Sequence, residues 1–382
     1  MSPELLVRFL RPFQGYLAAR GIALDGVVHD LAWVGRLHTV LTAVDPQMPG
    51  PLQQALLDVA DLASEQGHEI AVGLAGKPQL GLFEARPAVS PEDLAFRLFL
   101  DNAEVFAATQ ARVKSQEAQR FVDFMARFEG APAGLSSEAR RVLLVEQLRQ
   151  WFRARNRGGF IEVRVSEAPG EVTWLVVHGS PPRSLSVITS ESTRDRLSIV
   201  PDKQDTILFD RTTGRLSVCA QFPAERDFYR QAIGRVYFDD DEHFEAQPVL
   251  DCTVLLDAPE EALSPDGLDE LEGVELRELT LEAVAAPFDT MTWRAENLNG
   301  VLAHELPRIL VRTRRVAGAV LLLKVRGERR PKSVELVPPN KLKYDRRTHD
   351  GLVREYLFMK GFLRRADRAA LNEEGDRHGA GA

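Results

Sequence analysis

The spacing of apolar residues changes near Gly159, and this change restricts the chain to a fold with a helical part and a β-rich part. Before this point apolar side chains recur at helical intervals, as in Leu5, Leu6, Phe9 and Leu10. Such spacing places them on one face of a helix. After it, short runs rich in β-branched residues are separated by Pro, Gly and Ser, which is typical of strands joined by turns. The pattern predicts an α+β protein with antiparallel strands.

The length of 382 residues leads us to expect two or three domains. We predict an all-helical N-terminal domain over 1–158 and a mixed α/β domain with antiparallel strands over 159–290. A basic C-terminal module over 291–370 and a disordered tail over 371–382 complete the chain. The boundaries follow changes of periodicity and charge, because the sequence contains no repeat and no low-complexity linker.

Two stretches of the N-terminal domain carry clear helix boundaries. In "SPED", Ser90 can cap a helix whose first position is Pro91. A second helix is predicted to begin near Ser136 or Ser137 and to run through Phe152, until "NRGG" ends it.

The central domain contains one strong hairpin signal, "TILFDRTTGRLSVCA", in which Gly214 supplies the positive φ of the turn. "PAERDFYRQAIG" then predicts a helix that ends at Gly234. Further strands are expected at "VLDCTVLLD" and "VELRELTL".

In the C-terminal module, "TWRAENLNGVLAHEL" indicates a helix. "GAVLLLKVRGERRPKSVELVPP" indicates a hairpin with its tip at 327–330, and a last helix is capped by Thr348 or Asp350 and ended by Gly361. A helix, a hairpin with a basic tip and a second helix are compatible with a winged-helix-like module.

The charges are distributed very unevenly along the chain. The net charge is −8, yet residues 301–370 carry 18 Lys+Arg against 7 Asp+Glu, and residues 371–382 carry −2, so that −17 falls on residues 1–300. Such asymmetry is typical of an acidic body joined to a segment that seeks a polyanion. The alternative is that the basic segment docks on the acidic body of its own chain or on an acidic protein partner. Both interpretations remain open at this stage.

The candidate binding residues lie on the predicted hairpin and on the loop after Pro338 and Pro339. Phosphate contacts need cationic donors on exposed tips, and an aromatic ring could stack on a base. We therefore expect non-specific binding of DNA or RNA, or of an acidic protein, through Arg326, Arg329, Arg330, Lys332, Lys341, Lys343, Tyr344, Arg346 and Arg347.

Two other features could carry chemistry. The stretch "FDDDEHFEAQPVLD" gathers carboxylates from Asp239 to Glu245, as a metal-dependent nuclease would require. Its plainer interpretation is a solvated turn in which Asp240 or Asp241 caps a short helix through Phe244. His178 follows a strand and could be a catalytic base, but a structural histidine is the favoured interpretation because no nucleophile is placed beside it.

The sequence lacks the motifs of several enzyme classes. It contains no G-x-S-x-G, no Walker A loop and no G-x-G-x-x-G, and the glycines of "GLAGKPQLG" have the wrong spacing for a phosphate loop. We predict no catalytic residue, no metal and no cofactor. With two cysteines and no apolar segment long enough for a signal peptide or a membrane span, a cytoplasmic location is expected.

Three stretches together carry a family resemblance. "VVHGSPPRSLSVI", "PDKQDTILFDRTTGRLSVCAQFPAERDFYRQAIGRVYFDDDEHF" and "VELVPPNKLKYDRRTHDGLVREYLFMKGF" resemble uncharacterised bacterial proteins associated with anti-phage defence-type gene clusters. The resemblance covers roughly the last two thirds of the chain, and it assigns no fold, activity or site residue. It implies an accessory component of a multi-gene antiviral system.

Three functions are therefore carried forward. The first is a bacterial accessory or adaptor protein without enzymatic activity that binds nucleic acid, an acidic partner or other proteins of its gene cluster. The second is a metal-dependent nuclease that uses the Asp239–Glu245 carboxylates. The third is a structural scaffold whose acidic and basic regions neutralise each other.

Overall fold

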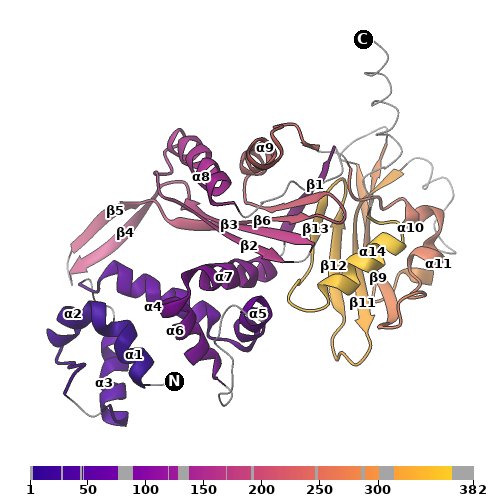
Figure 1. Ribbon diagram of the computed structural model, residues 1–382. Coiled ribbons are helices and arrows are strands. Elements are labelled where there is room, and N and C mark those ends of the chain that lie inside the picture. The colour runs from indigo at the N-terminus through magenta and orange to yellow at the C-terminus, as the bar shows by residue number, and fades with distance from the viewer. Residues whose placement is uncertain are drawn as a thin grey trace. The chain divides into compact units, whose positions relative to one another are not determined.

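The computed structural model describes residues 3–363 except 27–28, 44, 46, 76–88, 119, 128–136, 169, 191–192, 246–247, 285–288 and 301–313. The chain divides into two compact units, Met1–Val113 and Lys114–Ala382 (Figure 1). The predicted C-terminal tail lies outside the described residues.

The first unit is helical, as the sequence predicts. Its elements are α1 (Pro3–Leu10), a 3-10 turn η1 (Arg11–Phe13), α2 (Gln14–Ala18), α3 (Leu31–Thr42), α4 (Gly50–Leu62), α5 (Glu65–Ala75), α6 (Pro91–Asp101) and most of α7 (Ala103–Glu117). The predicted start of α6 is confirmed, because the Ser90 side chain accepts a hydrogen bond from the Asp93 amide and Pro91 occupies the first turn. Their apolar faces meet in one core around Phe9, Leu52 and Leu98.

The second unit is built on an eleven-stranded antiparallel sheet, in the strand order β10-β9-β11-β12-β13-β1-β7-β6-β3-β2, with β8 also paired to β1. The strands are β1 (Arg120–Ala126), β2 (Ile161–Ala168), β3 (Glu171–Gly179), β6 (Asp202–Asp210), β7 (Arg215–Cys219), β8 (Phe244–Glu245), β9 (Leu271–Ala283), β10 (Thr290–Arg294), β11 (Arg314–Val325), β12 (Lys332–Val337) and β13 (Lys341–Lys343). A separate two-stranded ribbon consists of β4 (Arg183–Ser190) and β5 (Thr193–Ile199). The predicted α+β class with antiparallel strands is confirmed.

Among the described residues, the helices that accompany this sheet are α8 (Glu138–Arg153), α9 (Pro223–Phe238), α10 (Val254–Asp257), α11 (Pro259–Ala262) and α14 (Asp350–Met359). Helices α8 and α9 lie on the same side of the strands β6, β3 and β2 (Figure 1). Beneath them, Phe152, Trp174 and Tyr229 belong to one buried core. A second core, around Leu276, Leu321 and Tyr356, includes Leu342 of the short strand β13. The sheet therefore carries two apolar cores, and β13 contributes to the second.

Several local predictions are confirmed. The β6–β7 hairpin forms with Gly214 at a φ of 67°, and the Asp210 side chain accepts bonds from the amides that follow it. Helix α8 follows Ser137, and β11 and β12 pair around a tip at Gly327, whose φ is 80°. The last helix ends before Gly361, although its N-cap residue is His349.

Other predictions are wrong. Residues 120–126, expected to be helical, form β1, which pairs with β7 and β13. Residues 254–257, expected in a strand, form α10. Helix α9 continues through Gly234 and ends at Asp239, which adopts a left-handed conformation with a φ of 58°. Gly234 is needed for a different reason, since the carbonyl oxygen of Asp240 lies where a Cβ atom would be.

The winged-helix-like module is also wrong for the residues that the structure describes. The helix expected over 292–306 is present only in part, because residues 292–294 belong to β10 and pair with β9, residues 299–300 are helical, and 301–306 lie outside the described residues. The hairpin β11–β12 is not a free wing, because β11 pairs with β9 along most of its length and β12 pairs with β13. Long-range pairing of this kind leaves no local signal in the sequence, and it merges the hairpin with the main sheet.

Candidate functional site

The hairpin tip between β11 and β12 presents a cluster of exposed cations. Arg326, Arg329 and Arg330 are all exposed, because the chain turns back within four residues and leaves no neighbour to cover them. None of the three forms an ion pair with a residue that the structure describes. A cation without an internal partner keeps its full charge for an external one.

A cavity of about 600 Å³ lies beside this tip. Its lining includes the cations Arg329, Arg330, Lys332 and Lys343, together with the carboxylates Glu328, Glu335 and Asp345. Lys343 forms an ion pair with Glu335 at 3.1 Å, and Lys332 donates a hydrogen bond to the Thr348 hydroxyl. Because a hydroxyl does not neutralise a charge, Lys332 and the two tip arginines all lack an ion pair with a residue that the structure describes.

The short strand β13 connects this cavity to a second one. Lys343 pairs across the sheet with Glu335 of β12 on one side and with Arg120 of β1 on the other, so the three side chains lie in one row on one face. The second cavity has a volume of about 670 Å³, and Lys343 and Glu335 line it as well. It also contains Lys341, which is exposed and forms no ion pair with a described residue.

Three further cations of the second cavity were missed by sequence reasoning. Arg120 comes from β1, Lys203 from β6 and Arg226 from the first turn of α9. Each stands alone among ordinary residues in the sequence, so only the strand order β13-β1-β7-β6 brings them together. No signal in the sequence could have found them without that topology.

Two of the predicted binding residues lie inside the protein. Tyr344 is 4% exposed and its hydroxyl donates to Asp350, while Arg346 is also 4% exposed and lies 3.9 Å from the centre of the Phe121 ring. A base cannot stack on a ring that is covered on both faces, and a buried guanidinium cannot reach a phosphate in solution. Arg347, in contrast, is exposed, but it is held by Asp345 at 2.8 Å. The surface formed by Arg326, Arg329, Arg330, Lys332, Lys341 and Lys343 is called the basic surface below.

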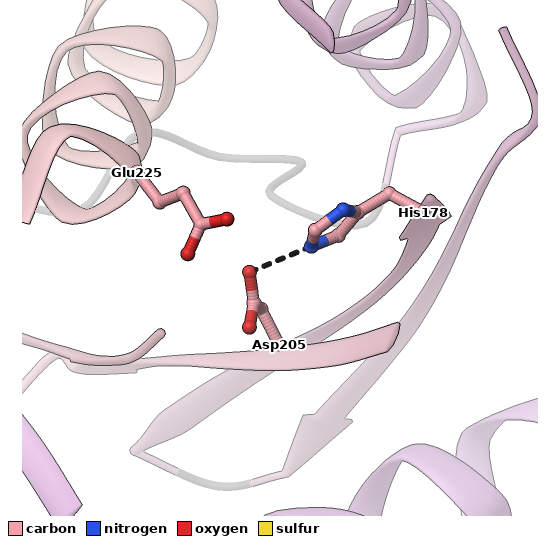
Figure 2. Close-up of side chains that lie close together, drawn as sticks. All are labelled: His178, Asp205 and Glu225. Carbon is pink, nitrogen blue, oxygen red and sulfur yellow. Dashed lines mark hydrogen bonds and ion pairs between the residues drawn. The ribbon is translucent and has the colours of Figure 1, made fainter. Parts of the chain in front are cut away.

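His178 belongs to a buried cluster of charged groups, which we call the Asp205 cluster (Figure 2). His178 comes from the end of β3, Asp205 from β6 and Glu225 from α9. The His178 Nε2 atom lies 2.8 Å from an Asp205 carboxylate oxygen, and its Nδ1 atom donates to the carbonyl of Gly179 at 2.8 Å. Its ring stacks on Phe152 with the centroids 3.9 Å apart. The imidazole is therefore fixed on all sides.

Every carboxylate oxygen of this cluster already has a donor. Asp205 accepts from the Tyr229 hydroxyl at 2.9 Å as well as from His178, and its other oxygen lies 3.0 Å from the Lys203 ammonium. Glu225 is bound by Lys203 at 2.9 Å and by Arg157, and it accepts from the Phe222 amide at 3.0 Å in a capping box. Proximity to Asp205 and burial hold the pKa of Tyr229 well above its usual value, burial being the larger cause.

The ligand atoms of His178, Asp205 and Glu225 lie within 4.8 Å of one another, so the three could surround a metal ion. The Lys203 ammonium, however, already bridges both carboxylates. A divalent ion would have to displace that lysine and would find no vacant oxygen. The arrangement is therefore best explained as an ion-pair cluster that ties β3, β6 and α9 together, in agreement with the structural interpretation of His178.

The Asp239–Glu245 carboxylates do not converge. Asp240 accepts from the Glu242 amide, Asp241 pairs with Arg235 at 3.0 Å and Glu245 pairs with Arg127 at 2.6 Å. The short helix expected here is wrong, since the stretch forms a turn followed by β8. Among the described residues, the three-residue groupings suited to a metal include none from this loop.

A second buried group of charges lies on the other face of the sheet, and we call it the Arg215 cluster. Arg215 and Asp123 are 1% and 0% exposed, with 3.8 Å between a guanidinium nitrogen and a carboxylate oxygen. Because side chains alternate along a strand, these residues point away from the face that carries Asp205. Arg346, Asp350 and Arg354 complete the cluster.

The comparisons with known proteins leave the chain without an assigned family. No protein-family model matches it, and no curated protein sequence matches it. In the part of the chain that the structure describes, no helix has the length and apolar character needed to cross a bilayer.

Proposed function

We propose that this protein binds nucleic acid through the basic surface and acts as an accessory or adaptor component without enzymatic activity. The observation that carries the proposal is the pair of cavities joined at Lys343, which extend a strip of exposed cations from the hairpin tip to β13. Phosphates are neutralised by lysine and arginine side chains that have no partner within the protein. An accessory role in an anti-phage defence-type gene cluster belongs to the same proposal and depends on the sequence resemblance alone.

The basic surface favours a polyanion over neutralisation by the chain itself. If acidic residues of the same chain neutralised the basic surface, its cations would form ion pairs with them. No such ion pair with a described residue is formed by Arg329, Arg330 or Lys341. Base-specific contacts need several polar side chains aimed at one edge of a base. The arginines on a turn and the two lysines at the ends of a three-residue strand favour binding to the backbone without sequence preference.

The test uses the full-length chain, because β11, β12 and β13 pair with β9 and β1 and a C-terminal fragment would lose those partners. Fluorescence anisotropy with labelled single-stranded and duplex DNA is measured over a series of salt concentrations. Arg329→Ala/Arg330→Ala should weaken binding and reduce the salt slope by up to about 1.4 on a single strand, since each phosphate contact releases roughly 0.7 of a counterion.

The matched control is Arg36→Ala/Arg183→Ala. It removes the same charge from two exposed arginines outside both cavities. The control should keep the wild-type slope. If the wild type binds no nucleic acid at low salt, the proposal is wrong, and an acidic protein partner or the scaffold function becomes the better explanation.

A further inference from the structure

The second cavity differs from the hairpin tip in its shape and lining. Five cations and two carboxylates line it, and the cations come from β1, β6, α9 and β13. Its volume of about 670 Å³ lies within the ~300–1,000 Å³ usual for small-molecule sites. The rest of the lining consists of Gln204, Cys219, Gln221 and five apolar residues, of which Val337 is partly exposed and Phe121, Val122, Ala220 and Leu342 are buried.

Three of the cations are available to a ligand. Arg120 and Lys341 are exposed, Arg226 is half-buried, and none of them forms an ion pair with a residue that the structure describes. The other two are engaged, Lys343 with Glu335 and Lys203 with Asp205 and Glu225. Unpaired cations from three separate elements that line one cavity are suited to an anion with several oxygens, such as a phosphate.

The remaining lining suits a flat organic group. Gln204 and Gln221 are exposed at the cavity and offer both donors and acceptors. These amides could form hydrogen bonds with the polar edge of a base, and the partly exposed Val337 could contact it. Lys203 and Asp205 of the buried cluster also line the cavity, so a rigid ion-pair network forms part of its wall.

We infer that the second cavity binds a mononucleotide, with its phosphate at Arg120, Arg226 and Lys341 and its base beside Gln204 and Gln221. This site shares Lys341 and Lys343 with the basic surface, whereas Arg329 and Arg330 of the hairpin tip line only the first cavity. The two cavities are linked through Lys343, because this residue and Glu335 line both of them. A nucleotide that draws Lys343 away from Glu335 changes the charge available to the tip cavity.

The test is isothermal titration of the full-length protein with AMP, ATP, adenosine, ribose 5-phosphate and inorganic pyrophosphate. AMP and ATP should bind, and adenosine and ribose 5-phosphate should each bind at least about tenfold more weakly, since each lacks one half of the recognised group. Arg120→Ala/Arg226→Ala should weaken AMP binding by about a hundredfold, or roughly tenfold for each lost charge-assisted contact. Arg120→Lys/Arg226→Lys should recover part of that loss and shows that the fold is intact.

The cross-test separates the two sites. Arg329→Ala/Arg330→Ala should leave AMP binding unchanged although it lowers the salt slope of DNA binding. If AMP binds the wild type while DNA does not, the proposed function fails and this inference stands. If no nucleotide binds, if AMP binds the Arg120→Ala/Arg226→Ala variant as tightly as the wild type, or if pyrophosphate binds as tightly as ATP, the inference is overturned.

Discussion

The two buried charge clusters lie on opposite faces of one sheet and satisfy their charges in opposite ways. In the Asp205 cluster, each oxygen of Asp205 and Glu225 has at least one donor, and Lys203 bridges the two carboxylates. In the Arg215 cluster, neither oxygen of Asp123 and none of the three nitrogens of Arg215 forms a hydrogen bond with a residue that the structure describes. Asp123 and Arg215 are nearly completely buried, as are Asp205 and Glu225.

The difference shows that burial and pairing are separate properties of a charge. Removal of one partner from a complete network leaves the others buried without compensation, which is strongly destabilising. Where hydrogen bonds are missing already, the desolvation penalty is present in the native protein. Accordingly, burial lowers the pKa of Arg215, and the attraction of Asp123 opposes that effect only in part. The Asp205 cluster should therefore tolerate substitution far less well than the Arg215 cluster.

The largest effect is expected for Asp205→Ala. This change leaves His178, Tyr229 and Lys203 without their common acceptor, and a loss of about 3–5 kcal/mol in the free energy of unfolding follows from the removal of one partner of a buried pair. Urea denaturation of the full-length protein measures it. A loss below about 1 kcal/mol would contradict the assignment of this cluster as the tie between β3, β6 and α9.

The second prediction concerns exchange of the whole pair. Asp123→Val/Arg215→Met replaces a poorly bonded buried ion pair with apolar side chains, and it should be neutral or stabilise the protein by up to about 4 kcal/mol. Arg215→Met alone should destabilise, because Asp123 would then stay buried without the cation that lies 3.8 Å from it. The same denaturation experiment compares the three proteins. A double variant less stable than the single one would show that the pair is worth more than its geometry suggests.

The third prediction concerns the buried side chain of His243. Burial lowers the pKa of His243, with a smaller opposing attraction from Asp240 and a repulsion from Arg127. Its folded pKa lies below the unfolded value of 6.5, so the unfolded chain binds the proton first. The contribution of His243 is complete above pH 6.5 and is lost as the pH falls through that value toward the lower folded pKa. The loss amounts to about 1.4 kcal/mol for each unit by which the pKa is displaced.

Thermal unfolding measured between pH 7.5 and pH 5 checks this change of stability with pH, because the range includes the usual histidine pKa of about 6.5. His243→Phe keeps a ring that can stack on Phe238, which His243 contacts with the centroids 4.0 Å apart. The variant should show a flatter pH dependence than the wild type. An unchanged slope would assign the effect to other groups.

The smallest effect is expected for Asp241→Ala in the acidic loop. Both Asp241 and its partner Arg235 are 52% exposed, and an exposed ion pair contributes about 0–1 kcal/mol. The variant should unfold within that range of the wild type and should also keep its DNA binding. A large loss of a metal-dependent nuclease activity would instead revive the carboxylate loop as a catalytic site.

Local signals in the sequence were enough to predict the class and many element boundaries. Ser90, Gly214 and Gly327 act through their own backbone geometry and their nearest neighbours, so their consequences can be read from a few residues. The pairing of β13 with β1 joins residues 341–343 to residues 120–122, and no pattern of spacing records such a contact. Because β7 and β13, the partners of β1, are distant in the sequence, local spacing does not predict β1 as a strand.

The candidate site was predictable only in part. The composition of residues 326–347 reveals a surplus of cations, and Arg329, Arg330 and Lys341 are exposed as a basic surface requires. Composition does not reveal that Arg346 lies under Phe121 or that Tyr344 is held by Asp350, because burial is decided by tertiary packing. Arg120 and Arg226 join the second cavity for the same reason.

Strand β13 also has a mechanical consequence. It is three residues long and forms three register pairs with β12 and three with β1, while it joins the part of the sheet around Leu321 to the part around Trp174. Under a pulling force that separates these two parts, the load is concentrated on this narrow seam, and the sheet would part there before its longer strands separate. Lys341 and Lys343 are the ends of that strand, so an anion that contacts either lysine acts directly on the weakest joint of the sheet.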